Sequence, residues 1–130
     1  MNIQEQIKGN NKIGELFGNL FLIRNQIHLN HLKITGNGSY AGHIALNEFY
    51  DQLVDMIDGL IESYQGKYGI IQITIPNHTN MDSIMILEKL ASLTDDGSYH
   101  RIFKDTYLQN QIDELTTLTY KTLYKLKNLK

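Results

Sequence analysis

The sequence predicts an all-α protein: one domain, residues 1–130, folded as a four-helix bundle with a long connection between its second and third helices. Apolar residues recur every three or four positions in four separate segments, which is the spacing of one helix face. A single proline in the whole chain leaves long stretches free to be helical. That proline lies in GIIQITIPNHTN, residues 69–80, whose β-branched side chains favour an extended connection.

The first two predicted helices are joined by a short turn. The first covers residues 10–34, and the second ends near Gly66. Between them, Gly36 and Gly38 favour a helix stop, and Ser39 is suited to cap the following helix. The apolar seams consist of Ile13, Leu16, Phe17, Leu20, Ile23 and Ile27 on the first helix, and Leu46, Tyr50, Leu53, Ile57, Leu60 and Tyr64 on the second.

The last two predicted helices follow the connection. Asn80 or Asp82 caps the third helix, which runs to about Thr94, where DDGS breaks the pattern. The fourth helix begins near Tyr99. Their apolar positions are Ile84, Leu87, Leu90 and Ala91 on the third helix, and Leu108, Ile112, Leu115, Thr119, Thr122 and Leu126 on the fourth.

The composition excludes several classes of protein. The absence of cysteine rules out disulfides, thiolate metal sites and cysteine nucleophiles. No apolar run approaches the roughly 20 residues of a membrane span, and the first residues lack the apolar stretch of a signal peptide, so we expect a cytoplasmic protein without membrane contact. A net charge of −2 gives no global attraction to nucleic acid. The C-terminal lysines are better explained by the helix dipole than by a DNA-binding tail; they are Lys121, Lys125, Lys127 and Lys130.

Metal ligands in this chain must come from histidine and carboxylate side chains, which together suit iron, manganese or zinc rather than calcium. The histidines are His28, His31, His43, His78 and His100. An acidic stripe with spacings of four, three and four lies on one face of the second helix; it consists of Asp51, Asp55, Asp58 and Glu62. Taken singly, a histidine such as His28, His78 or His100 is more often structural, and an acidic face is more often only solvated.

Helix geometry separates these groups within one chain. Fifteen residues, or about 22 Å along the helix axis, lie between His43 and Asp58, so the two cannot hold the same ion. His31 and His43 flank the turn and can approach each other, whereas Asp58 and Glu62 lie toward the other end. Two such hairpins packed antiparallel about a two-fold axis would set the histidines of one copy against the acids of the other. A shared site would then occur twice per dimer.

The segment HLKITGNGSYAGHIALNEFYDQLVDMIDGLIESY, residues 31–64, resembles the ferroxidase segment of the Dps family, the DNA-protection miniferritins of the ferritin-like superfamily. The family pattern is a histidine, a glycine five positions later, a second histidine twelve positions after the first, an aspartate fifteen further on and a glutamate four beyond. The matching positions here are His31, Gly36, His43, Asp58 and Glu62. The resemblance covers about the first half of the chain.

This resemblance implies a ferritin-like bundle in which iron is bound and oxidised between paired subunits. His31, His43, Asp58 and Glu62 would be both the metal ligands and the catalytic residues, with manganese or zinc as substitutes for iron in a mono-iron or di-iron centre. Peroxide or dioxygen would be the oxidant, and the roles implied are ferroxidase activity, iron storage and protection against oxidative stress. Glu48, Asp51 and Asp55 are either outer-sphere or second-metal groups or members of surface salt bridges. Family members form two-fold dimers and, in the complete shell, dodecamers.

The chain also departs from the family pattern. Leu32 stands where the family usually has tryptophan, Ser63 stands where arginine commonly follows the glutamate, and no lysine-rich N-terminal extension occurs. The C-terminal stretch resembles ferritin-like proteins of tailed phages, which would place the protein in the cytoplasm of a host cell. These departures favour an alternative, a non-catalytic ferritin-like oligomeric scaffold. A DNA-binding protein acting through its C-terminal lysines is a further alternative.

Overall fold

The computed structural model describes residues 2–77 and 80–130, without the side chains of 5–8 and 10. This part of the chain is helical and contains no strand, which confirms the predicted all-α class. None of its helices is both long and apolar enough to cross a membrane. The elements are α1 (Ile3–Lys33), α2 (Ser39–Tyr68), α3 (Ser83–Asp95), a short 3₁₀ turn η1 (His100–Ile102) and α4 (Thr106–Asn128).

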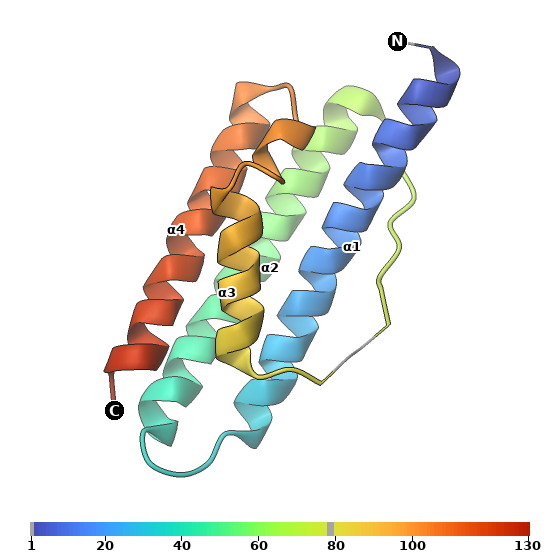
Figure 1. The fold of residues 1–130 in the computed structure, drawn as a ribbon. Coiled ribbons are helices and arrows are strands. Elements are labelled where there is room, and N and C mark those ends of the chain that lie inside the picture. Colours follow the sequence, from blue (N-terminus) through green and yellow to red (C-terminus); the bar gives the residue numbers. More distant parts are fainter. Residues whose placement is uncertain (1, 78–79) are drawn as a thin grey trace.

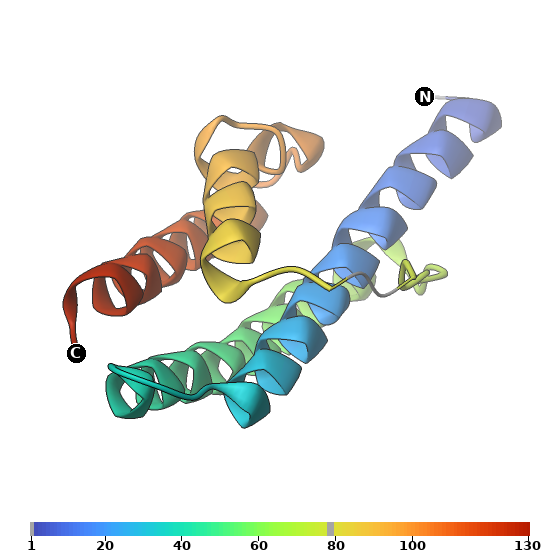
Figure 2. The same cartoon turned by 60° about the horizontal axis from the view of Figure 1, so that its bottom comes forward.

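The four helices form a bundle-like arrangement in which α1 and α2 make one antiparallel hairpin, and α3 and α4 make another (Figure 1). The packing runs from α1 to α2, from α2 to α4 and from α4 to α3, with a looser contact between α3 and α1. Figure 2 shows the hairpin of α1 and α2 as one layer and that of α3 and α4 as the other. One outer face of the α1–α2 hairpin therefore remains free of the rest of the chain.

The predicted apolar seams meet between these layers. The interior is formed by side chains with at most 1% exposure from every helix: Phe17, Leu20, Ile27, Leu46, Phe49, Leu53, Ile57, Leu87, Leu90, Leu108 and Ile112. Complete burial of one such side chain contributes about 1.5–3 kcal/mol relative to leaving it exposed. The core therefore fixes which faces of α1 and α2 point outward, and with them the positions of the histidines and acids.

Two helix starts differ from the predicted ones. Helix α1 begins at Ile3 rather than at residue 10, because the polar residues before its apolar stripe contain no proline to stop the helix. Helix α4 begins at Thr106 rather than near Tyr99. The intervening residues form η1, and the side chains of Tyr99 and Phe103 are buried at 8% and 3% exposure. Packing of these two aromatic rings replaces the extra helical turn that the pattern predicted.

The turn between α1 and α2 contains a third difference. The N-cap of α2 is Gly38, not Ser39, and no side chain caps this helix. Gly36 and Gly38 have φ angles of 92° and 80°, in the left-handed region where glycine is favoured, and both lie in the turn after α1 ends at Lys33. At α3 the predicted cap Asp82 accepts a hydrogen bond from the backbone N–H of Met85 at 3.1 Å.

The segment that leaves α2 runs beside α1 and touches its backbone (Figure 1). Residues 69–77 and 80–82 carry no helix or strand. Ile71 and Ile73 pack against the core, while the carbonyl oxygens of the residues that follow each of them approach α1. A Cβ atom at Gly14 would lie 2.2 Å from the carbonyl oxygen of Gln72, and one at Gly18 would lie 1.7 Å from that of Thr74. The two glycines thus provide the groove in which this segment lies.

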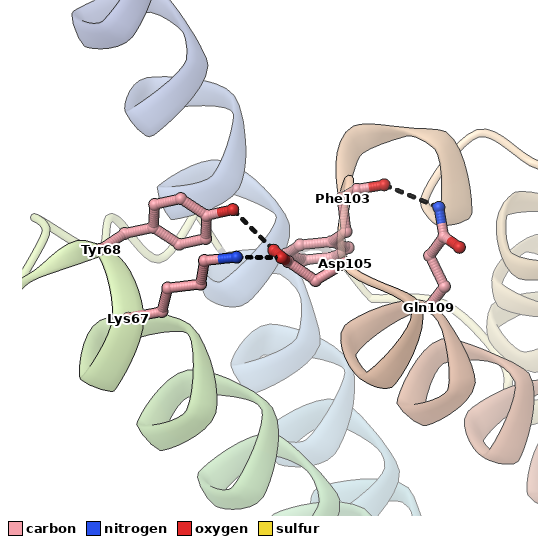
Figure 3. A network of polar contacts seen from close by, with 5 residues as sticks. All are labelled: Lys67, Tyr68, Phe103, Asp105 and Gln109. Carbon is pink, nitrogen blue, oxygen red and sulfur yellow. Dashed lines mark hydrogen bonds and ion pairs between the residues drawn. The ribbon is translucent and has the colours of Figure 1, made fainter.

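A polar network ties the end of α2 to the start of α4 (Figure 3). Lys67 and Tyr68 both donate hydrogen bonds to the carboxylate of Asp105, the Tyr68 hydroxyl at 2.6 Å. The hydrogen bond from Lys67 is the main reason why the pKa of Asp105 is lowered. One turn further, the Gln109 side chain donates to the carbonyl oxygen of Phe103 at 2.8 Å. This network belongs to the opposite end of α2 from the histidines.

Candidate metal site at the end of the α1–α2 hairpin

His31 and His43 contact each other directly at the closed end of the α1–α2 hairpin. Their Nε2 atoms are 2.9 Å apart, and their ring centroids are 3.7 Å apart. The ring of His31 is buried at 6% exposure, whereas His43 is exposed on α2. The proximity predicted from the hairpin is therefore confirmed. The turn at Gly36 and Gly38 produces it, because it reverses the chain within five residues.

The hydrogen bonds of His43 define which of its nitrogens is free to bind a cation. Its Nδ1 lies 3.3 Å from the backbone carbonyl oxygen of His31. A carbonyl oxygen only accepts, so this nitrogen carries the proton. In the neutral ring Nε2 then keeps its lone pair and is the nitrogen that can bind a cation. A backbone carbonyl that fixes the tautomer in this way is a common outer partner of metal-binding histidines.

His31 does not have the bonding of a fully satisfied core histidine. Its Nε2 contacts His43, but its buried Nδ1 has no hydrogen-bond partner in the described part of the chain. Buried polar side-chain atoms in native proteins are mostly paired, so a structural role leaves this nitrogen unexplained. In this respect His31 differs from His28 and His100, which have polar partners at 3.3 Å and 3.6 Å.

A polar seam extends from this pair toward the middle of the hairpin. The ring of His28 stacks on that of Tyr50 at 4.2 Å between centroids, and the guanidinium of Arg24 lies over the same ring at 5.2 Å. The Tyr50 hydroxyl donates to Asn47 at 2.7 Å. His28 lies further from the pair, with its ring centroid 6.1 Å from that of His31. His28 therefore packs beside the site on Tyr50 rather than joining the two imidazoles.

The surroundings of His31 lower its pKa below the ordinary value of 6.5. Burial is the main cause, and the neighbouring rings of His43 and His28 add to it, while the carboxylate of Asp51 acts in the opposite direction. The neutral ring is thus the form that the fold favours, and the neutral ring is also the form that binds a metal ion.

This shift predicts that acid destabilises the metal-free protein through His31. The unfolded chain binds a proton at this ring near pH 6.5 more readily than the folded chain does, so the stability is fully present above that pH and is lost as the pH falls through it. The free energy of unfolding of wild type and of His31→Gln should be measured in urea between about pH 7.5 and 5. The decrease toward acid should be smaller in the variant, and equal decreases would contradict the assignment to His31.

The predicted acidic ligands lie elsewhere on α2. Asp58 and Glu62 are exposed, about four turns or more beyond His43 along the same helix. In the described part of a single chain, no three histidine, aspartate or glutamate side chains come together as a metal site. One chain therefore brings together His31 and His43 but not the two acids, as the spacing argument predicted.

Two further acids on α2, Glu48 and Asp51, have local partners. Lys125 of α4 contacts Glu48 at 2.8 Å, which supports the salt-bridge interpretation for that carboxylate, and Asn47 donates to Asp51 at 3.2 Å. At the far end of the chain, His100 lies 3.6 Å from Asp113 and away from the pair. His78 lies outside the described residues.

Two of the four C-terminal lysines take part in ion pairs with neighbouring helices. Lys125 contacts Glu48 of α2, and Lys127 contacts Glu88 of α3 at 3.1 Å. Both lie in the last turn of α4, where positive charge also suits the helix dipole. These contacts favour a structural role for the lysines over a free basic tail.

Sequence reasoning placed Tyr50 in the apolar seam and did not single out Arg24. Both residues form part of the polar seam beside the histidines. The available signal was the spacing of Arg24, His28 and His31 by four and three residues, which puts all three side chains within about 60° on α1.

Comparison with known proteins gives one match. A family model described as "Family of unknown function (DUF5856)" matches residues 31–126, and this range contains His31, His43, Asp58 and Glu62. No curated protein and no solved structure matches the chain.

Proposed function

We propose that this chain, which belongs to the DUF5856 family of unknown function, binds ferrous iron between two copies of itself and promotes its oxidation. The observation that carries the proposal is the contact between His31 and His43, two imidazoles from different helices with their Nε2 atoms 2.9 Å apart. The four candidate ligands also have the spacing of the Dps ferroxidase segment.

The spacing of the two nitrogens suits a shared ion. Imidazole nitrogens lie about 2.0–2.1 Å from a bound zinc or similar ion, so two of them separated by about 2.9 Å subtend close to 90° at the metal. That is the angle between neighbouring ligands in an octahedral site. The two rings are stacked with 30° between their planes, so they must turn before both in-plane lone pairs meet at one ion, and His43 is exposed on its outer side, where solvent leaves room for that turn.

The remaining ligands would come from a second copy. Asp58 and Glu62 are exposed, and in the described part of the chain no lysine, arginine or histidine forms an ion pair with either. An antiparallel pair of hairpins would set them against His31 and His43, giving two equivalent sites. Two carboxylates would offset the charge of the cation and favour the ferric product, while the imidazoles make the site suitable for iron.

The test is anaerobic titration with ferrous iron, followed by addition of peroxide or air and measurement of ferric absorbance. Wild type should bind iron saturably and oxidise it faster than buffer alone. His43→Ala and Asp58→Ala should each lower the affinity by at least about a hundredfold, since even the loss of an outer-shell partner costs up to that much. His100→Ala and Asp113→Ala are matched controls away from the site and should behave as wild type.

Mixing the two defective chains then distinguishes a shared site from a site within one chain. In a random mixture half of the dimers contain both variants, and each of these has one site with all four ligands intact. About one quarter of the wild-type sites should therefore return. A site built within one chain would return none. Saturable iron binding without oxidation would favour the alternative, a non-catalytic scaffold. If the protein neither bound iron nor oxidised it faster than buffer does, the proposed metal function would be wrong.

A further inference from the structure

Arg24 carries a positive charge that has no counter-charge among the described residues. No carboxylate in the described residues lies within 4 Å of its guanidinium, whose NH1 group contacts only Asn25 at 3.4 Å and His28 at 3.3 Å. Its Nε is buried and has no hydrogen-bond partner in the part of the chain that the structure describes. A partly desolvated cation of this kind is costly unless an anion stands nearby.

In the described part of the chain, helix α2 carries unpaired negative charge on its outer side. Its acidic stripe Asp51, Asp55, Asp58 and Glu62 is exposed and forms no ion pair with a basic residue of the described chain. Toward the N-terminal end the same stripe becomes apolar, with Tyr40 exposed by 79% and Ile44 by 37%. Along this stripe the exposed side chains therefore change from apolar at Tyr40 and Ile44 to acidic from Asp51 to Glu62.

The charges near the middle of the hairpin, the cation Arg24 and the acids Asp51 and Asp55, are complementary to those of a second copy packed antiparallel. In the dimer of the proposed function, the two-fold axis lies halfway between His43 and the pair Asp58 and Glu62, near residues 51 and 52 of α2. Arg24 lies over Tyr50 and therefore almost at this level. Rotation by 180° about this axis places Arg24 of one copy opposite residue 53 of the second copy.

The nearest acids to that level are Asp51 and Asp55. Each is two residues away, or about 3 Å along the helix axis, which is well within the reach of an arginine side chain. We propose that Arg24 of each copy pairs with Asp51 and Asp55 of the other copy, and that this reciprocal ion pair at the two-fold axis holds the hairpins in the register that completes the metal site. The pairing rests on the proposed dimer, but it does not require bound metal.

Charge reversal tests the pairing in metal-free buffer containing a chelator. The dimer dissociation constant should be measured by sedimentation equilibrium for Arg24→Glu and for Asp51→Lys/Asp55→Lys. Each variant places like charges together twice in its own dimer, and we expect the constant to rise by roughly a hundredfold. Lys89→Glu, on an exposed position of α3, is the matched control and should leave the constant unchanged. Circular dichroism shows whether each variant keeps its helices.

Mixing the two charge-reversed chains gives the decisive result. In the heterodimer one contact is the wild-type pair and the other is the pair with its charges exchanged, so affinity near that of wild type should return. A wild-type monomer, unchanged dimerisation of the variants, or no recovery on mixing would overturn the pairing. A tight metal-free dimer that behaves as predicted but binds no iron would sustain this inference while the proposed function failed. If Arg24→Glu left the iron sites unaffected, the proposed function would stand and the Arg24 pairing would fail.

Discussion

Replacement of Gly18 by alanine is expected to lower the free energy of unfolding by about 3 kcal/mol, and the melting temperature by about 10 °C. The added Cβ would lie 1.7 Å from the carbonyl oxygen of Thr74, and the atoms it meets are backbone rather than a flexible side chain. Either α1 or the segment after α2 must move. Because Ile71 and Ile73 pack on the core beside this contact, their burial would be lost with it.

Gly66→Ala is the matched control for this change. Gly66 also lies within a helix, but a Cβ there meets nothing within 4 Å. Alanine should therefore stabilise the protein by about 0.5–1 kcal/mol through helix propensity alone. Hydrogen exchange should show opening confined to residues 69–77 in the Gly18 variant. An equal rise in stability for both variants would show that the segment does not lie against α1 as described.

The apolar spacing alone was enough to predict the four helices, because burial of Leu53, Leu87 or Leu108 requires one particular helix face. It did not predict the groove at Gly14 and Gly18. In a sequence, a glycine within a helix indicates only a lower helix propensity. The neighbouring residues do not indicate which distant backbone segment will approach it. The start of α4 was misplaced for a related reason, since burial of Tyr99 and Phe103 on either side of a 3₁₀ turn leaves the same apolar spacing as a helix.

Residue spacing likewise predicted one part of the candidate site and not another. The contact of His31 with His43 follows from a hairpin closed by two left-handed glycines, so residue spacing was sufficient to predict it. The stacking of His28 and Arg24 on Tyr50 depends on side-chain conformations across two helices, which residue spacing does not specify. For that reason the sequence alone did not predict that Arg24 lacks a carboxylate partner among the described residues.

Manganese(II) at one hundred times its dissociation constant is expected to stabilise the wild-type protein by about 2.7 kcal/mol. Manganese(II) serves here as a surrogate for ferrous iron, because air does not readily oxidise it. At this chain length the melting temperature should rise by about 8–10 °C. In the proposed site the ion would bind only where His31 and His43 meet carboxylates, so the unfolded chain would gain little from it. The measurement is thermal unfolding with and without metal at one fixed protein concentration, because the stability of the proposed dimer would depend on concentration.

The informative comparison is between His43→Ala and Asp58→Ala. Within one chain the two positions are separated by about 22 Å, too far for a common ion, so a site made by a single chain would lose its stabilisation only in the histidine variant. A site shared across the two-fold axis would lose it in both. Asp113→Ala, at an exposed position on α4, should keep the full rise in melting temperature. If Asp58→Ala also kept it, the carboxylates would not be ligands, and His31 and His43 would have to be completed by water or by another group.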